Sequence, residues 1–152
     1  MPSNAAYRVM EITPRERPGL ERHFLALAGE DRRLRFGAGM SDEAIREYVG
    51  EIDFGTDTVF GILGEERRVL AAAHMARGPQ DAELGVSVLA GHRGGGFGAA
   101  LLRRAHHHAR KLGLRELYLF CLTENGAMMR LARRQGMKIV CTSGQCRAAL
   151  AA

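Results

Sequence analysis

A run of glycines directly in front of a helical pattern is the stretch of this chain whose residue types most suggest chemistry. Residues 92–105 read HRGGGFGAALLRRA. Glycine is the poorest helix former after proline, so its concentration at this point needs a reason. A glycine-rich turn at a helix N-terminus gathers backbone N–H groups at one point, where the helix dipole also favours negative charge. The stretch therefore predicts a binding site for a phosphate-bearing ligand.

Two common phosphate-binding motifs can be compared with this run. Residues 94–99, GGGFGA, can be read as GxGxxA, a weak form of the dinucleotide-binding fingerprint. That fingerprint expects an acidic residue at the end of the next strand, but the candidate strand runs to Thr123 with no acid before Glu124. A Walker loop is excluded because no Gly-Lys-Ser/Thr follows the glycines. An NAD(P)-dependent oxidoreductase therefore fits poorly and stays a third alternative.

Three consecutive histidines, His106, His107 and His108, follow in the same helical pattern. Consecutive residues on a helix point in directions about 100° apart, so the three rings cannot converge on one ion as residues i and i+4 can. We therefore expect a solvated helix face and no metal site. His74, on a candidate strand, is expected to be a buried histidine with its hydrogen bonds satisfied rather than a catalytic base.

The elements that must position the glycine run follow from hydrophobic periodicity and turn residues. Between residues 18 and 52 the pattern is helical but broken near residues 37–39, which predicts two helices joined by a glycine-containing loop. Two further helices are expected, over residues 98–112 and 125–135. Strands are expected over residues 7–13, 58–63, 68–75, 82–89, 116–122, 137–141 and 145–150.

In chain order these elements predict an α+β fold, with a mixed and mostly antiparallel central sheet flanked by helices. The one clear β–α–β crossover runs from strand 82–89 through helix 98–112 to strand 116–122. The glycine run lies at the hinge of that crossover. The last of these strands, ELYLFCL, is apolar on both faces, which predicts a central strand covered on both sides.

Length and composition limit the class of protein. The 152 residues, 46% hydrophobic and 26% charged, predict a single domain over residues 1–152. No apolar run approaches the ~20 residues of a membrane span, and the N-terminus shows no secretory segment, so we expect no membrane partner and a cytoplasmic location. The net charge of +5 is scattered without a nucleic-acid motif, so no nucleic-acid partner is expected.

Cys121, Cys141 and Cys146 fit neither a disulfide framework nor a paired zinc motif, and we expect reduced core thiols.

Read from the arginine, residues 93–98 form the pattern R-x-x-G-x-G, which resembles motif A of the GNAT family of N-acetyltransferases. The resemblance extends beyond this motif. Residues 85–102, GVSVLAGHRGGGFGAALL, are similar to the family's fourth strand, pyrophosphate loop and third helix. LYLFCLTEN and MMRLARRQGM are similar to its fifth strand and fourth helix. The order of the elements matches as well, and residues 34–49 resemble the family's variable first pair of helices.

The resemblance implies acetyl-CoA as the co-substrate. Its pyrophosphate would lie on a cradle of backbone amides, where glycine lacks the Cβ that would hold the backbone away. In the family the fourth and fifth strands splay apart, and the pantetheine arm pairs with the fourth. A homodimer through the C-terminal strands is also implied, since residues 145–150 would otherwise form a sheet edge. The cofactor-binding residues implied are Val86, Ser87, Val88, Arg93, Gly94, Gly95, Gly96, Phe97, Gly98, Ala99 and Asn125.

Acetyl transfer requires a neutral amine, a polarised thioester carbonyl and a proton for the leaving thiolate. The backbone N–H of Val88 is the candidate for polarisation. Glu83 is the candidate base because the resemblance places it on the fourth strand near the acetyl group; a surface or salt-bridged glutamate is the alternative. The acid is unassigned, because Ala132 stands where the family often has a tyrosine. Tyr118, Cys121 and Thr123 are the remaining candidate side chains, with core packing as the alternative role for the first two; water as the donor, or release of the thiolate unaided, is the alternative to all three.

These observations predict a single-domain, acetyl-CoA-dependent N-acetyltransferase. The acceptor would be a primary amine of a small molecule or of a protein, and the first two helices do not decide between them. The missing tyrosine keeps open an alternative from another class, a CoA-binding sensor or interaction module without turnover.

Overall fold

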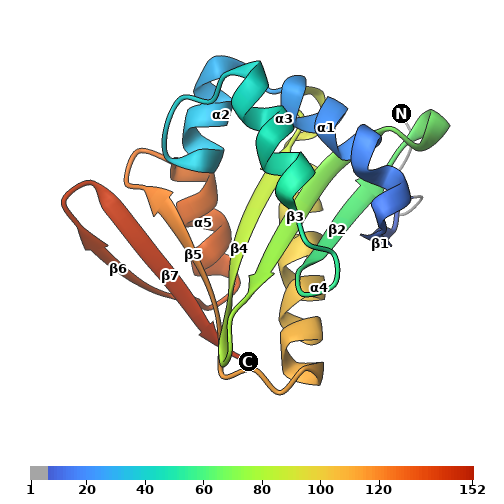
Figure 1. Cartoon of the computed structure of the whole chain (residues 1–152). Coiled ribbons are helices and arrows are strands. Elements are labelled where there is room, and N and C mark those ends of the chain that lie inside the picture. Colours follow the sequence, from blue (N-terminus) through green and yellow to red (C-terminus); the bar gives the residue numbers. More distant parts are fainter. Residues whose placement is uncertain (1–6) are drawn as a thin grey trace.

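The computed structural model describes residues 7–152 and has a seven-stranded sheet at its centre (Figure 1). The strand order is β1-β2-β3-β4-β5-β7-β6. β4 and β5 are parallel, and every other neighbouring pair is antiparallel. The predicted α+β class with a mixed, mostly antiparallel sheet is confirmed. The strands are β1 (Val9–Ile12), β2 (Thr58–Leu63), β3 (Val69–Arg77), β4 (Asp81–Val88), β5 (Glu116–Leu122), β6 (Lys138–Thr142) and β7 (Gln145–Ala151).

Within residues 7–152, five α-helices cover the two faces of this sheet (Figure 1). α1 and α3 contribute to one buried hydrophobic cluster, and α4 and α5 contribute to another. Neighbouring strand residues such as Val59 and Phe60 belong to different clusters, as expected for opposite faces of a sheet. None of these helices is long and apolar enough to span a membrane. They are α1 (Arg17–Leu25), α2 (Gly29–Phe36), α3 (Asp42–Glu51), α4 (Phe97–Lys111) and α5 (Gly126–Arg134).

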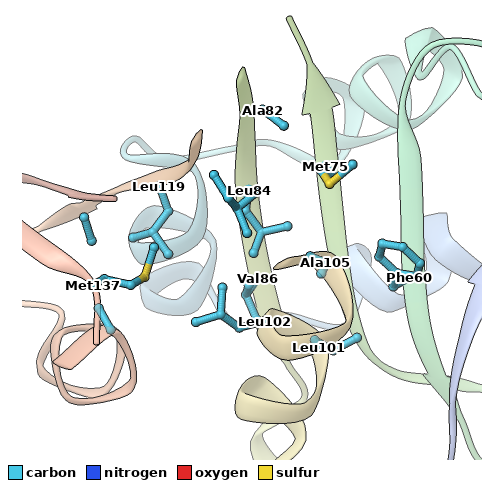
Figure 2. Packing of buried hydrophobic residues seen from close by; sticks show 14 of the residues in the cluster. Phe60, Met75, Ala82, Leu84, Val86, Leu101, Leu102, Ala105, Leu119 and Met137 are labelled. Atoms are coloured by element: carbon cyan, nitrogen blue, oxygen red, sulfur yellow. The ribbon is translucent and has the colours of Figure 1, made fainter. Parts of the chain in front are cut away.

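The larger hydrophobic cluster anchors β4 against α4 (Figure 2). Leu84 and Val86 of β4 lie close to Leu101 and Leu102 of the helix, and all four are buried. Because side chains alternate along a strand, the other face of β4 is turned away from α4. That face carries Glu83, so the packing of the core decides on which side of the sheet this carboxylate stands.

The first helical region has three helices where two were expected. The additional break lies between α1 and α2, where Ala28 is extended and precedes α2. The side chain of Arg32 stabilises this break: Nε donates to the carbonyl of Leu27 at 3.0 Å, and one terminal nitrogen donates to that of Leu25 at 2.8 Å. Carbonyls at a helix C-terminus need such donors. A turn without proline is therefore held by a contact from the next helix, which local pattern does not reveal.

The C-terminal half of the sheet corrects two expectations. Only one face of β5 is fully covered, and Phe120 on the other face is 44% exposed. The expectation of a strand covered on both sides is therefore wrong, because this face borders the divergence from β4 described below. Residues 145–150 are not a sheet edge either, since β7 lies between β5 and β6. The edge strand on this side is β6.

The expectation of three reduced cysteines is wrong for two of them. Cys141 of β6 and Cys146 of β7 are directly opposite each other in the register, and they form a disulfide. Their Cα atoms are 4.0 Å apart. Cys121, on the neighbouring β5, is a buried free thiol. The pairing depends on the hairpin register, which the spacing of the cysteines alone does not define.

Candidate active site

The two parallel strands β4 and β5 diverge toward their carboxyl ends (Figure 1). β4 and β5 pair over three positions, the last of which sets Glu83 opposite Tyr118. Residues 84–88 continue to pair with β3, while the described part of β5 offers them no partner. The divergence leaves a cleft of about 800 Å³ at the carboxyl ends of the two strands. Ligands of α/β proteins commonly bind at this end of a parallel pair.

The backbone edge of β4 faces this cleft. The N–H of Leu89 donates to the Leu70 carbonyl of β3 at 2.9 Å. Since successive N–H groups of a strand point to opposite edges, the N–H of Val88 is directed toward the cleft, and so is that of Val86. The Val88 carbonyl lies on the same edge and accepts hydrogen bonds from the Arg93 side chain at 3.2 and 3.3 Å. The side chain of Ser87 is buried and contacts His23 Nε2 at 2.7 Å, and its N–H is directed toward β3, as that of Leu89 is.

The glycine loop lies at the N-terminus of α4 and forms one wall of the cleft. Gly94 and Gly96 have φ angles of +80° and +85°, a left-handed conformation that glycine adopts without strain. An added Cβ at either position would meet open space, so the backbone there is uncovered. Arg93 forms an ion pair with Asp31 of α2 at 2.9 Å, which ties the loop to the helices on the other side of the cleft.

The other residues expected to bind the cofactor lie around this loop. Phe97 is buried in the core and packs edge-on against the ring of Tyr7, with ring centroids 5.4 Å apart. Asn125 caps α5, where its side chain accepts from the Met128 N–H at 3.2 Å. Gly95 lies between the two left-handed glycines. The cleft is lined by Val86, Ser87, Val88, Arg93, Gly94, Gly96, Phe97, Gly98, Ala99 and Asn125.

Glu83 lies at the vertex of the divergence, where β4 and β5 cease to pair. The residue is exposed and lines the cleft. Among residues 7–152 the Glu83 carboxylate forms no ion pair, which argues against the alternative of a salt-bridged glutamate. Tyr118 is opposite, and its pKa is raised mainly by burial and secondarily by the charge of Glu83. Its ring contacts the Arg147 guanidinium at 4.4 Å.

A polar network beside Glu83 was not predicted from the sequence. His74 Nε2 lies 2.8 Å from an Asp57 carboxylate oxygen, and His74 Nδ1 lies 2.5 Å from the Tyr48 hydroxyl. Arg35 of α2 donates to the same hydroxyl at 3.1 Å. The expectation that the hydrogen bonds of His74 are satisfied is confirmed, but the residue also lines the cleft. A histidine in the apolar run AAAHMA was the one local signal of this network.

Burial controls the charge of this network. Desolvation lowers the pKa of His74, although the Asp57 carboxylate acts in the opposite direction. Desolvation likewise raises the pKa of Tyr48, while the charge of Arg35 opposes the shift. With a neutral imidazole, Nε2–H donates to Asp57 and Nδ1 accepts from the Tyr48 hydroxyl. The network thus has a neutral imidazole and a neutral hydroxyl between the Asp57 carboxylate at one end and the Arg35 cation at the other.

The three consecutive histidines lie in three different surroundings. His106 Nε2 lies 2.8 Å from the Ala151 carbonyl, and His108 Nε2 lies 3.3 Å from the Thr58 hydroxyl. His107 is exposed. Among the residues that the structure describes, no group of three His, Cys, Asp or Glu side chains is arranged to hold a metal ion.

The residues considered as a proton donor occupy different places. Ala132 is fully buried in α5, so the position of the expected tyrosine belongs to the core here. Cys121 lines the cleft, but its thiol is directed at the Met129 sulfur at 3.5 Å and its pKa is raised by burial. Thr123 is exposed just after β5.

A model of the acetyltransferase (GNAT) family matches residues 15–137. This chain therefore belongs to the GNAT family. No protein among curated sequences matches it significantly.

Solved structures of the family have the same fold. The GNAT domain of the S. lividans PAT is 21% identical, with a TM-score of 0.82 over 96% of this chain and 90% of that one. An N-acetyltransferase from Staphylococcus aureus Mu50 is 15% identical, with a TM-score of 0.74 over 95% and 98%. The ribosomal-protein-S18-alanine N-acetyltransferase from Escherichia coli is 16% identical, with a TM-score of 0.73 over 95% and 93%. The family and fold support acyl transfer from an acyl-CoA, and they leave the acyl group and the acceptor to be proposed.

Proposed function

We propose that this protein transfers an acetyl group from acetyl-CoA to a primary amine. The observation that carries the proposal is the cleft between β4 and β5, which ends at the glycine loop and the N-terminus of α4. One wall offers backbone N–H groups to an amide-bearing arm, and the end of the cleft offers N–H groups and a helix dipole to phosphates.

The described residues fit a CoA thioester along the whole cleft. The uncovered backbone of Gly94 and Gly96 admits phosphate oxygens at close range. Arg130 and Arg134 of α5 line the same cleft and add positive charge. The backbone of Val86 and Val88 would pair with the pantetheine amides as an additional strand would.

The chemical step moves one acetyl group and two protons. The amine nitrogen attacks the thioester carbonyl carbon, a C–N bond forms and the C–S bond breaks. Glu83 takes a proton from the amine, directly or through water, because it lies at the vertex of the cleft without an ion-pair partner. The N–H of Val88 stabilises the negative charge that develops on the carbonyl oxygen. The CoA thiolate leaves and takes a proton from solvent or from one of the remaining donors.

We further propose that the chain forms a homodimer through its C-terminal strands. β6 is the edge strand on this side of the sheet, and Val140 on it is 58% exposed. An exposed apolar edge strand favours pairing with another copy. Phe120 adds a second exposed apolar side chain on β5.

Calorimetric titration with acetyl-CoA, CoA and NADPH tests the proposed cofactor, and thiol release with a panel of amines tests turnover. The expected result is binding of both CoA species and amine-dependent release of CoA. Binding without turnover on any amine would favour the sensor or interaction module, which the buried Ala132 keeps as the alternative. Binding of NADPH instead of CoA would contradict the proposal.

A further inference from the structure

Two side chains of opposite charge stand unpaired on the same side of the cleft. Arg35 of α2 and Glu83 of β4 both line it. Within the described part of the chain, neither forms an ion pair with any other group or with each other. Nearby charges are used differently, since Asp31 pairs with Arg93 and Asp57 contacts His74. Arg35 and Glu83 therefore offer a ligand an unpaired cation and an unpaired anion close together at β4, while Arg130 and Arg134 line the cleft from α5.

The position of the Arg35 guanidinium relative to β4 is defined by Gly85. A Cβ added to Gly85 would lie 2.4 Å from the Arg35 Cζ, so the guanidinium occupies the space that a side chain of residue 85 would take. Glu83 and Gly85 share one face of β4. Two positions on the same face of a strand are about 7 Å apart. The cation and the carboxylate thus stand next to each other along the strand without touching.

The surroundings of Arg35 hold its guanidinium in place. It lies 4.5 Å from the ring centroid of Phe36 and 5.9 Å from that of Tyr48, and it donates to the Tyr48 hydroxyl. Its Nε is buried without a hydrogen-bond partner. A guanidinium has five N–H donors and binds carboxylates with two parallel hydrogen bonds. Aromatic faces stabilise the cation only in part, so a carboxylate would supply the partner that the described residues do not.

We propose that the acyl acceptor is a small zwitterion, a free amino acid whose carboxylate binds Arg35 while its amine lies at Glu83. This inference rests on the proposed acyltransferase function and names its substrate class. In an amino acid the amine and the carboxylate are separated by one or two carbons, which suits two opposite charges at neighbouring positions of one strand face. The side-chain amine of a lysine inside a protein has no free carboxylate of its own at such a distance, and a protein N-terminus has one only where the first residue is an aspartate.

The test compares each acceptor with its own carboxamide. Thiol release from acetyl-CoA is measured with the standard α-amino acids and β-alanine, and with the matched carboxamides, which keep the amine and remove the negative charge. We expect the preferred amino acid to exceed its carboxamide by roughly 10- to 100-fold in kcat/KM, mainly through KM, as for loss of a charged hydrogen-bonded pair. Carboxamides or a peptide with an internal lysine acting as well as the amino acids would overturn the inference.

Arg35→Met separates recognition from packing. Methionine keeps an apolar chain against Phe36 and removes the cation, so we expect the preference for acid over carboxamide to fall to about one. Arg46→Met is the matched control, because Arg46 is exposed on α3 and lies outside the cleft. A purely structural role of Arg35 would lower the activity toward both acceptors and leave their ratio unchanged, and that result would also overturn the inference.

Calorimetry on the CoA-saturated protein distinguishes failure of this inference from failure of the proposed function. Binding of amino acids but not of carboxamides, without thiol release, would support the subsite and contradict turnover. Thiol release with amines that lack a carboxylate, at a kcat/KM equal to that of the amino acids, would support the transferase and contradict the subsite. Absence of both binding and release for every amino acid would reject the inference outright. Circular dichroism melts of each variant verify that it is folded.

Discussion

At the scale of single residues, the vertex of the cleft combines a carboxylate open to solvent with a hydrogen-bonded network in which a neutral imidazole and hydroxyl link a carboxylate to a guanidinium. Glu83 is exposed, whereas the Tyr48 hydroxyl lies 2.5 Å from His74 Nδ1. His74 is also hydrogen-bonded to Asp57, and Tyr48 to Arg35. A base must exchange its proton with the amine and then with water. Glu83 forms no ion pair with a described residue, which supports its proposed role as the base, with the network orienting the acceptor.

Glu83→Gln tests the proposed base. Glutamine keeps the shape and the hydrogen bonding but cannot accept the proton, so we expect kcat/KM to fall by roughly 10²–10⁴. The calorimetric affinity for acetyl-CoA should stay unchanged, because the substitution leaves the glycine loop intact. Measurement of kcat/KM from about pH 6 to 9 for the wild type and for Glu83→Gln tests this expectation. If the two pH profiles of kcat/KM coincide, Glu83 is not the base, and the amine loses its proton to bulk water.

His23 makes the stability of the protein depend on pH. Desolvation lowers its pKa to about 4, because it is buried between the Val69 carbonyl and Ser87. An unfolded chain has a histidine pKa of about 6.5, so between these two values the unfolded state binds the proton more tightly. The stabilisation is complete above pH ~6.5 and is lost as the pH falls toward ~4. From pH 7 to pH 5 we expect the free energy of unfolding to fall by about 2 kcal/mol from this group alone.

Denaturant unfolding at these two pH values measures the effect of His23. The variant His23→Gln should lose less stability than the wild type over the same interval, whereas His107→Gln, at an exposed position of α4, should lose as much as the wild type. An equal loss in the wild type and in His23→Gln would assign the pH dependence to other groups.

At the scale of elements, the glycine loop and α4 act together. The left-handed φ of Gly96 at the N-cap lets the chain enter α4 while its backbone stays uncovered at the end of the cleft. A side chain there meets both a strained φ and the space that the phosphates would use. This conformation supports the proposed binding of phosphates by the loop.

Gly96→Val should weaken CoA binding by roughly 30-fold or more, about 2 kcal/mol, by blocking hydrogen bonds from the loop to phosphate. Gly113→Val is the matched control, since Gly113 has a φ of +71° just after the other end of α4, with open space around it. Both variants lose roughly 1–3 kcal/mol of stability from strain. Calorimetric titration with CoA on the folded variants measures the difference. Equal CoA affinity in the two variants would mean that the loop does not bind the phosphates.

At the scale of the whole molecule, we expect a homodimer that uses the β6 edge. Light scattering at concentrations on the order of tens of micromolar, where weak dimers form, should report twice the mass of one chain. Val140→Asp places a charge on the exposed face of the edge strand and should shift the equilibrium to the monomer. A wild-type monomer at these concentrations would contradict the proposal, and an unchanged dimer in the variant would move the interface elsewhere.

Strong local signals in the sequence determined several elements of the fold and the family of this protein. β2 and β5 begin and end at the predicted residues, 58–63 and 116–122. The glycine run precedes α4 as predicted, and the arginine with the spaced glycines identified the family. Each of these features depends on residues within one or two turns of each other, through periodicity, capping or glycine conformation. Such short-range effects depend on neighbouring residues, so they can be predicted without knowledge of the fold.

The tertiary structure alone decided how distant segments meet. The break between α1 and α2 depends on hydrogen bonds from Arg32, and the disulfide depends on the register of the β6–β7 hairpin. The network from Asp57 to Arg35 joins residues of two helices, one strand and the segment before β2. The network joins residues from 35 to 74, and the contacts of Arg32 and of the cysteines, although only five to seven residues apart in the sequence, depend on the turn or hairpin that the chain forms there. These contacts form because burial of two apolar clusters packs the helices against the sheet. The same packing positions the charged side chains of the cleft.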